Sequence, residues 1–223
     1  MRKAAILVEG QTEEGFVNRV LRPHLADLDV WLTPIIVQTK RMASGHKYRG
    51  GVSKWSKVET DISSLLGGSH WLFVTTMLDY YGLPVDAPGY QSRPASGWDA
   101  VDHIERAIGG RGGDGRLIPY LSLHEFEALL FVRPDVVAGL ARDPSLAGTL
   151  SSIVTACGAP EAIDDGPDTA PSKRLSSAWP GYSKTTDATA VLSTIGLASI
   201  RNSCPHFDGW LTRLEACAGA EPA

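Results

Sequence analysis

Three sets of acidic residues in this sequence stand directly after apolar runs, where their carboxylates could do chemistry. Glu9 follows "AAILV", Asp79 ends "HWLFVTTMLD", and Glu125 and Glu127 come after "LIPYLSL". Short continuous apolar runs are typical of strands buried on both faces. Carboxylate oxygens are hard ligands that suit Mg²⁺ or Mn²⁺, and such ions can clamp a phosphoryl centre and activate water. The pattern therefore favours metal-dependent cleavage of a phosphodiester.

The segments between these runs have helical character, which determines how the strands must be arranged. The apolar spacing over residues 16–25 is helical, residues 32–39 read as a second strand, and residues 58–67 and 98–109 read as helices. Helical crossovers make successive strands parallel. The strands should then end at one rim of the sheet, where open parallel sheets hold their ligands.

The first helix explains some of the nearby acids but not all of them. We expect Thr12 to cap this helix, and Glu13 and Glu14 to lie in its first turn, where the helix dipole favours acids. Glu9 has no such structural role because it ends the preceding strand. We therefore assign Glu9 to function.

Other catalytic classes lack their motifs in this chain. "HEFE" lacks the second His of HExxH, and "CPHF" is not a paired zinc site. There is no GxSxG elbow for a serine hydrolase and no GxxxxGK[ST] loop for a P-loop ATPase.

Length and composition indicate one globular domain. The chain has 223 residues, of which 43% are hydrophobic, and its formal net charge is −4. Its first apolar run is too short for a signal peptide, and no run has the length of a membrane span. Three cysteines without a CxxC pair suit free thiols in the cytoplasm.

One segment is strongly basic although the whole chain is acidic. No Asp or Glu occurs between Asp29 and Glu59, and Tyr48 and Trp55 stand among the basic residues there. These basic residues are Lys40, Arg41, Lys47, Arg49, Lys54 and Lys57. The segment could follow a phosphate backbone and stack on bases, or it could be a solvated basic loop.

Several motifs, taken in order, resemble those of a bacterial TOPRIM-like family, domain of unknown function 4276. They are "VEGQTEEGFV", "TTMLDYYGLP", "IPYLSLHEFEALLF", "PSKRL", "PGYSK" and "CPHFDGWLTRLE". The resemblance implies a TOPRIM-like, Rossmann-like α/β fold with a mainly parallel sheet flanked by helices, related to the nuclease domains of overcoming-lysogenization-defect (OLD) proteins. We expect this core over residues 1–140 and a small, mostly helical extension over residues 141–223, packed on the core as one structural domain. The resemblance also suggests a setting in phage defence or mobile elements, beside an ATPase partner.

The resemblance assigns roles to the acids. In TOPRIM folds a Glu after the first strand is catalytic, which matches Glu9, and a later Asp-x-Asp pair binds metal. Asp79 takes the first position of that pair, but Tyr81 stands at the second. OLD-type nucleases have a second Glu four residues after the first, which matches Glu13. Glu13, Glu125 or Glu127 could supply the missing ligand, and whether the site holds one ion, two or none stays open.

The region after Leu140 carries one further catalytic candidate. Lys184, in "PGYSK", could reach the rim and stabilise transition-state charge, or it could be an exposed lysine on a loop. Residues 159–175 read as a loop, and residues 187–217 read as two helices.

These observations lead to a main expectation and two alternatives. We expect a cytoplasmic, Mg²⁺- or Mn²⁺-dependent nuclease or nuclease subunit that acts on DNA or RNA. The first alternative is a catalytically silent regulatory or assembly subunit of an ATPase-containing defence complex. A weaker one is small-molecule phosphotransfer. The sequence leaves open DNA against RNA, exo- against endonuclease action, and whether the chain forms an oligomer.

Overall fold

The computed structural model describes residues 1–37, 54–95, 97–164 and 166–220. Its strands form a five-stranded sheet in the order β2-β1-β3-β4, with β5 also paired to β3. All of these pairings are parallel, so the strands end at one edge. The strands are β1 Arg2–Val8, β2 Val30–Ile36, β3 Trp71–Asp79, β4 Leu117–Ile118 and β5 Leu121–Ser122. The predicted α/β fold with a mainly parallel sheet is confirmed.

The central strand β1 is buried on both faces, as its apolar run predicts. Ala4 to Val8 have no exposed surface. Ile6 and Val8 belong to one hydrophobic cluster, whereas Leu7 belongs to a second cluster on the other side. The alternation follows from the two-residue period of a strand, which points successive side chains to opposite faces.

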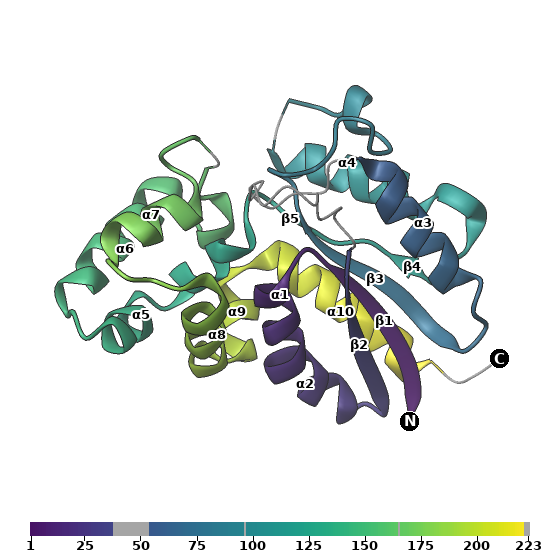
Figure 1. The fold of residues 1–223 in the computed structure, drawn as a ribbon, viewed down its shortest axis with the longest axis horizontal. Coiled ribbons are helices and arrows are strands. Elements are labelled where there is room, and N and C mark those ends of the chain that lie inside the picture. Colours follow the sequence, from purple (N-terminus) through teal and green to yellow (C-terminus); the bar gives the residue numbers. More distant parts are fainter. Residues whose placement is uncertain (38–53, 96, 165, 221–223) are drawn as a thin grey trace, which may run out of the picture.

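Helices cover both faces of this sheet (Figure 1). The cluster around Ile6 includes Phe16, Leu25 and Trp210, from the first helices and the last one, and the cluster around Leu7 includes residues of α3 and α4. The helices are α1 Gln11–Phe16, α2 Arg22–Ala26, α3 Trp55–Leu66, α4 Gly97–Gly109, α5 Pro134–Ala141, α6 Ser145–Cys157, α7 Pro171–Ala178, α8 Thr189–Ile195, α9 Leu197–Ser203 and α10 Pro205–Gly219. A π-helical turn, Val17–Leu21, joins α1 to α2.

The C-terminal helices lie in two different positions relative to the sheet. Helix α10 lies against it, where the indole N–H of Trp210 donates a buried hydrogen bond to Thr75 Oγ1 in β3 at 2.9 Å. Helices α5, α6 and α7 instead form a lobe beside the edge where the strands end (Figure 1). Side chains from this lobe can therefore reach the rim.

The outer edge of β2 is poorly suited to form backbone hydrogen bonds with a further strand. The carbonyl of Leu32 faces away from β1 and accepts a hydrogen bond from Arg22 Nε at 2.8 Å. Pro34 is two residues farther along, so its missing N–H falls on the same outer side. An edge with a missing donor and an occupied acceptor is protected against pairing with another chain.

Three stretches of the chain have a different secondary structure from the one predicted. Residues 159–175 are not all loop, because α7 begins at Pro171, a residue whose fixed φ suits the first helical position. The predicted strand around Pro119 is divided into β4 and β5, since proline has no N–H for the ladder. The predicted pair of C-terminal helices is three helices, because Gly196, with a φ of 77°, separates α8 from α9.

Two further features concern the cysteines and the length of the helices. All three cysteines lie among the described residues, and they are free thiols. Within the part of the chain that the structure describes, none of the helices has the length and apolar composition needed to cross a membrane.

Candidate active site

Glu9 lies at the rim, directly after β1, and turns its carboxylate toward the neighbouring strand. Its Oε1 accepts a hydrogen bond from the backbone N–H of Asp79 at 2.9 Å. Burial raises the pKa of Glu9 from its ordinary 4.5 to about 7, although the bond from Asp79 opposes the shift, and the charge of Glu13 adds to it. Glu9 is therefore poised to exchange a proton near neutral pH.

Asp79 is the last residue of β3 and sits beside Glu9. Its Oδ1 accepts a hydrogen bond from the backbone N–H of Phe126 at 2.8 Å. Burial raises the pKa of Asp79 well above its ordinary value, and the charges of Glu9 and Glu127 raise it further. Tyr81, two residues farther along the chain, is 54% exposed and brings no acid to this position.

Glu13 joins the same group from helix α1. Glu13 and Glu14 lie in the first turn, as predicted, but Thr12 does not cap the helix. The prediction for Thr12 is wrong because the helix begins earlier, with Gly10 at the N-cap position and Thr12 buried inside the first turn. The Glu13 side chain is buried rather than solvated, and this burial raises its pKa, with a smaller contribution from the charge of Glu127.

Helix α1, which carries Glu13, packs closely against α8. A Cβ atom built on Gly15 would lie 2.6 Å from Thr189 Oγ1 of α8. Real Cβ atoms do not approach that closely, so a side chain at position 15 would push α1 away from α8. The glycine in "EEGF" thus allows the close approach of the two helices.

Glu127 is the most buried acid of the group and has a cation against it. It is 1% exposed and lies in the 3₁₀ helix Phe126–Val132. Its Oε1 lies 2.6 Å from Lys184 Nζ. Burial raises the pKa of Glu127, and the charge of Lys184 opposes that shift. For Lys184, burial lowers the pKa, but the carboxylates of Glu127 and Glu125 outweigh it and raise the pKa above its ordinary value.

Glu125 is near these residues but binds the lobe. Its Oε2 accepts a hydrogen bond from the backbone N–H of Ser172 at 2.8 Å, and its Oε1 accepts one from Ser172 Oγ at 3.0 Å. Ser172 lies in the first turn of α7, where exposed backbone N–H groups favour an anion. Glu125 therefore ties α7 to the segment that follows β5.

Tyr182 was not predicted from the sequence, although it stands in the "PGYSK" motif. Burial raises the pKa of its hydroxyl, followed by the charges of Glu127 and Asp187. The phenol therefore lies in an environment that disfavours its negative form, and it stays protonated. The sequence signal that could have identified it is its place two residues before Lys184.

The structure brings some of the predicted site residues close to one another, but it does not arrange them as a metal site. Glu9, Asp79, Glu13, Glu127 and Lys184 influence one another's pKa values, so they form one electrostatic cluster, called here the rim cluster. Among the described residues, however, no three His, Cys, Asp or Glu side chains are arranged to hold a metal ion.

The basic segment can be placed only in part. Lys40, Arg41, Lys47 and Arg49 lie outside the described residues. Lys54 is exposed just before α3, and Lys57 lies in its first turn. Trp55, which the nucleic-acid interpretation of this segment offered for stacking on bases, is 3% exposed and packs in the core with Val58 and Ile62, so it does not have that role.

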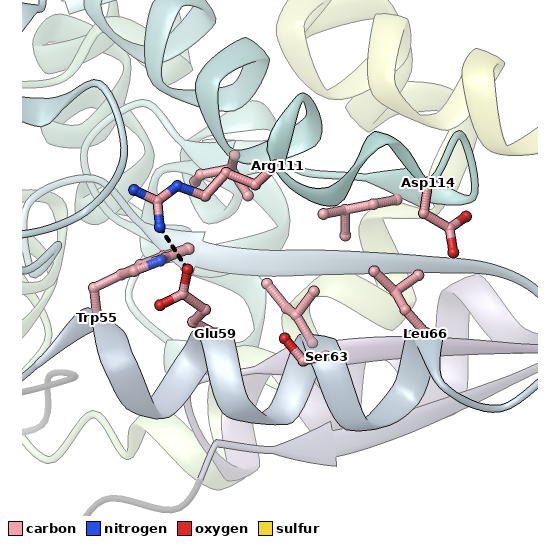
Figure 2. Close-up of a pocket in the computed structure, with 9 residues that line it drawn as sticks. Trp55, Glu59, Ser63, Leu66, Arg111 and Asp114 are labelled. Carbon is pink, nitrogen blue, oxygen red and sulfur yellow. Dashed lines mark hydrogen bonds and ion pairs between the residues drawn. The ribbon is translucent and has the colours of Figure 1, made fainter.

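A separate cavity lies away from the rim cluster. It has a volume of about 440 Å³ and lies between α3 and the segment that leads into β4. Figure 2 shows Trp55 and the ion pair of Glu59 with Arg111 at one end and Asp114 at the other. Its lining includes none of the residues of the rim cluster.

The sequence profile described as "Domain of unknown function (DUF4276)" matches residues 8–215. The chain belongs to this family. The matched region contains the whole rim cluster and Tyr182, so the cluster lies within the DUF4276 domain. Comparisons with curated proteins and with solved structures give no match.

Proposed function

We propose that this DUF4276 protein is a metal-dependent TOPRIM-type nuclease, or the nuclease subunit of a larger complex, that cleaves phosphodiester bonds of nucleic acids. The observation that carries the proposal is the pairing of Glu9 with Asp79 at the rim, with the pKa of both carboxyls raised. Perturbed carboxylic acids on adjacent strand ends of a parallel sheet are typical of catalytic sites.

The charge of the rim cluster supports a divalent cation. Glu9, Glu13, Asp79 and Glu127 are four acids, and Lys184 is the cation that the structure places against them. Clustered carboxylates repel one another unless they are protonated or bind a cation. Their hard oxygen atoms suit Mg²⁺ or Mn²⁺. Glu9 and Asp79 would hold the ion, with Glu13, Glu125 and Glu127 as further candidates, once side chains turn toward one another.

The chain's own residues would then have distinct roles. A bound Mg²⁺ would supply charge stabilisation at the phosphoryl group and activation of water. In the metal-free site Glu9, with its pKa near 7, exchanges a proton at neutral pH, and a bound cation would favour its ionised form, which can accept a proton as a general base. The Lys184 ammonium, 52% exposed at the side-chain level, can turn from Glu127 to a negatively charged phosphate oxygen.

A second candidate function is a silent regulatory or assembly subunit in an ATPase-containing phage-defence complex. It is favoured by the exposed Tyr81 at the position of the second metal-binding Asp. It predicts a chain that keeps the fold but shows neither metal-dependent stabilisation nor cleavage.

The test combines metal-titrated melting curves with cleavage assays on DNA and RNA. The variants Glu9→Gln and Asp79→Asn remove charge but keep the oxygens that accept hydrogen bonds from Asp79 and Phe126. Each should lower Mg²⁺- or Mn²⁺-dependent cleavage by about 100-fold or more and reduce the metal-induced rise in Tm. Glu14→Gln, which changes the next acid in the same turn, serves as the control and should behave as wild type. A wild-type chain without metal-dependent stabilisation or cleavage would replace the nuclease proposal with the silent subunit.

A further inference from the structure

The segment that carries Lys184 also fixes the position of a second polar side chain, Tyr182. The Tyr182 backbone N–H donates a hydrogen bond to the carbonyl of Trp179 at 3.1 Å, and the two rings lie 5.4 Å apart. The next backbone N–H, that of Ser183, donates to Asp187 Oδ2 at 2.7 Å. The Tyr182 ring is therefore held on an anchored backbone and packed on one side, which limits where its hydroxyl can point.

The hydroxyl of Tyr182 is buried without a hydrogen-bond partner among the described residues. Both oxygens of Glu127 are also buried, and apart from the ammonium of Lys184 they too lack a partner in the described part of the chain. After burial, the charge of Glu127 is the largest influence on the Tyr182 hydroxyl. Ser183, which separates Tyr182 from Lys184, has extended backbone with φ −112° and ψ 113°, so the side chains of Tyr182 and Lys184 leave the chain on the same side, and there the Lys184 ammonium meets Glu127. An unsatisfied donor and an under-satisfied acceptor therefore face the same region, an arrangement that natural structures seldom keep without a reason.

The two partners of the Glu127–Lys184 pair differ strongly in exposure. The Glu127 side chain is 1% exposed, whereas that of Lys184 is 52% exposed. Lys184 can therefore leave the pair, but Glu127 cannot follow it into solvent. Once Lys184 has turned away, a buried carboxylate remains without its counter-charge, which is strongly unfavourable.

We propose that Tyr182 is a positioning residue for Glu127: its hydroxyl donates a hydrogen bond to the Glu127 carboxylate when the Lys184 ammonium turns away. A phenol suits this role because it stays neutral and always carries a proton to donate. The exchange keeps Glu127 fixed while Lys184 moves to a substrate phosphate. Only this last step rests on the proposed nuclease function.

A double-mutant cycle tests the exchange without metal or nucleic acid. Lys184→Met removes the ammonium and keeps an apolar stem of similar length, and Tyr182→Phe removes only the hydroxyl. With Lys184 present, Tyr182→Phe should leave Tm unchanged or slightly raised, because it deletes an unsatisfied buried donor. With Lys184→Met, the same change should lower Tm by about 3 °C or more, because Glu127 then loses its remaining donor. Tyr81→Phe is the matched control, since Tyr81 is exposed, and it should have the same small effect in both backgrounds.

Each outcome decides the proposal. Equal effects of Tyr182→Phe in the two backgrounds would overturn it, because a residue with a merely structural role gives no coupling. If Lys184→Met and Lys184→Gln both fail to fold with Tyr182 intact, the hydroxyl does not compensate Glu127 and the proposal fails. Folding of either variant with Tyr182 but not with Phe at position 182 would support it.

A turnover measurement separates this inference from the proposed function. In an active wild type, Tyr182→Phe should lower kcat about 10-fold and leave KM nearly unchanged, because the hydroxyl acts on Glu127 and not on substrate binding. An unchanged kcat in that variant would contradict the catalytic part of the proposal. An inactive wild type would contradict the nuclease function, while the result of the stability cycle would still stand.

Discussion

At the residue scale, burial changes what an ordinary acid can do. Glu9 would be ionised throughout the neutral range in water, but at the rim its pKa is raised to about 7. The folded protein therefore binds a proton at Glu9 more tightly than the unfolded chain does. This contribution to stability is fully present below pH 4.5 and is lost as the pH rises through about 7.

We therefore predict that Glu9→Gln gains stability relative to wild type as the pH rises. In metal-free buffer the difference in unfolding free energy should grow by up to roughly 3 kcal/mol between pH 5 and pH 8, because one pKa unit corresponds to about 1.4 kcal/mol. Urea unfolding of both proteins across this range measures the difference. Glu14→Gln is the comparison, and its difference from wild type should change far less. A Glu9→Gln difference that stays constant with pH would show that Glu9 is not a buried acid.

Residue spacing was enough to anticipate some members of the rim cluster but not their contacts. Glu9 and Asp79 stand at the ends of apolar runs, and the parallel sheet places them together. The contact of Glu127 with Lys184 joins segments far apart in the chain, and no periodicity encodes such a pairing. The same holds for Tyr182. The basic neighbours of Trp55 suggested base stacking as one of two interpretations, but its apolar ring packs in the core.

At the scale of elements, strong periodicity gave the right structure, and the errors fell where the apolar pattern is weak or is interrupted by proline or glycine. The long apolar run of β3 and the amphipathic helix α4 end within one residue of their predicted limits. Helix α7 was missed because "PSKRLSSA" has one fully buried leucine and no apolar stripe. Its position depends instead on tertiary contacts, above all the hydrogen bonds from Ser172 to Glu125.

This dependence leads to a prediction for α7. Ser172→Ala removes the hydroxyl that donates to Glu125 and leaves a buried carboxylate oxygen short of one donor. The unfolding free energy should fall by about 1–2 kcal/mol, since hydrogen bonds to charged groups are among the stronger ones. Ser176→Ala, on the same helix, removes only a bond to the helix's own backbone and should change stability by less than about 0.5 kcal/mol. Equal effects of the two changes in urea unfolding would mean that the tether contributes nothing.

At the scale of the whole molecule, the net charge opposes binding of the proposed substrate, a nucleic acid, and one basic segment favours it. The formal net charge of −4 repels a polyanion, whereas the basic residues between Asp29 and Glu59 attract one. In the described part of that segment, Lys54 is exposed. Binding to nucleic acid should therefore be weak for the isolated chain at physiological salt, and stronger with a basic partner protein that supplies further contacts.

The salt dependence of binding can show whether the basic segment contacts the phosphates of a bound nucleic acid. Replacing Lys47, Arg49 and Lys54 with Ala should weaken binding and make the plot of log K against log salt shallower by about 2–3, because each lost phosphate contact removes nearly one released counterion. Arg106, Arg133 and Arg142, changed together to Ala, give the same change in net charge at positions outside the segment. That control should lower affinity only through the general field and should leave the slope nearly unchanged. Titrations of a fluorescent single strand at several salt concentrations measure both slopes. An unchanged slope in the first variant would assign the basic segment to the solvated surface and would place the phosphate contacts elsewhere on the molecule.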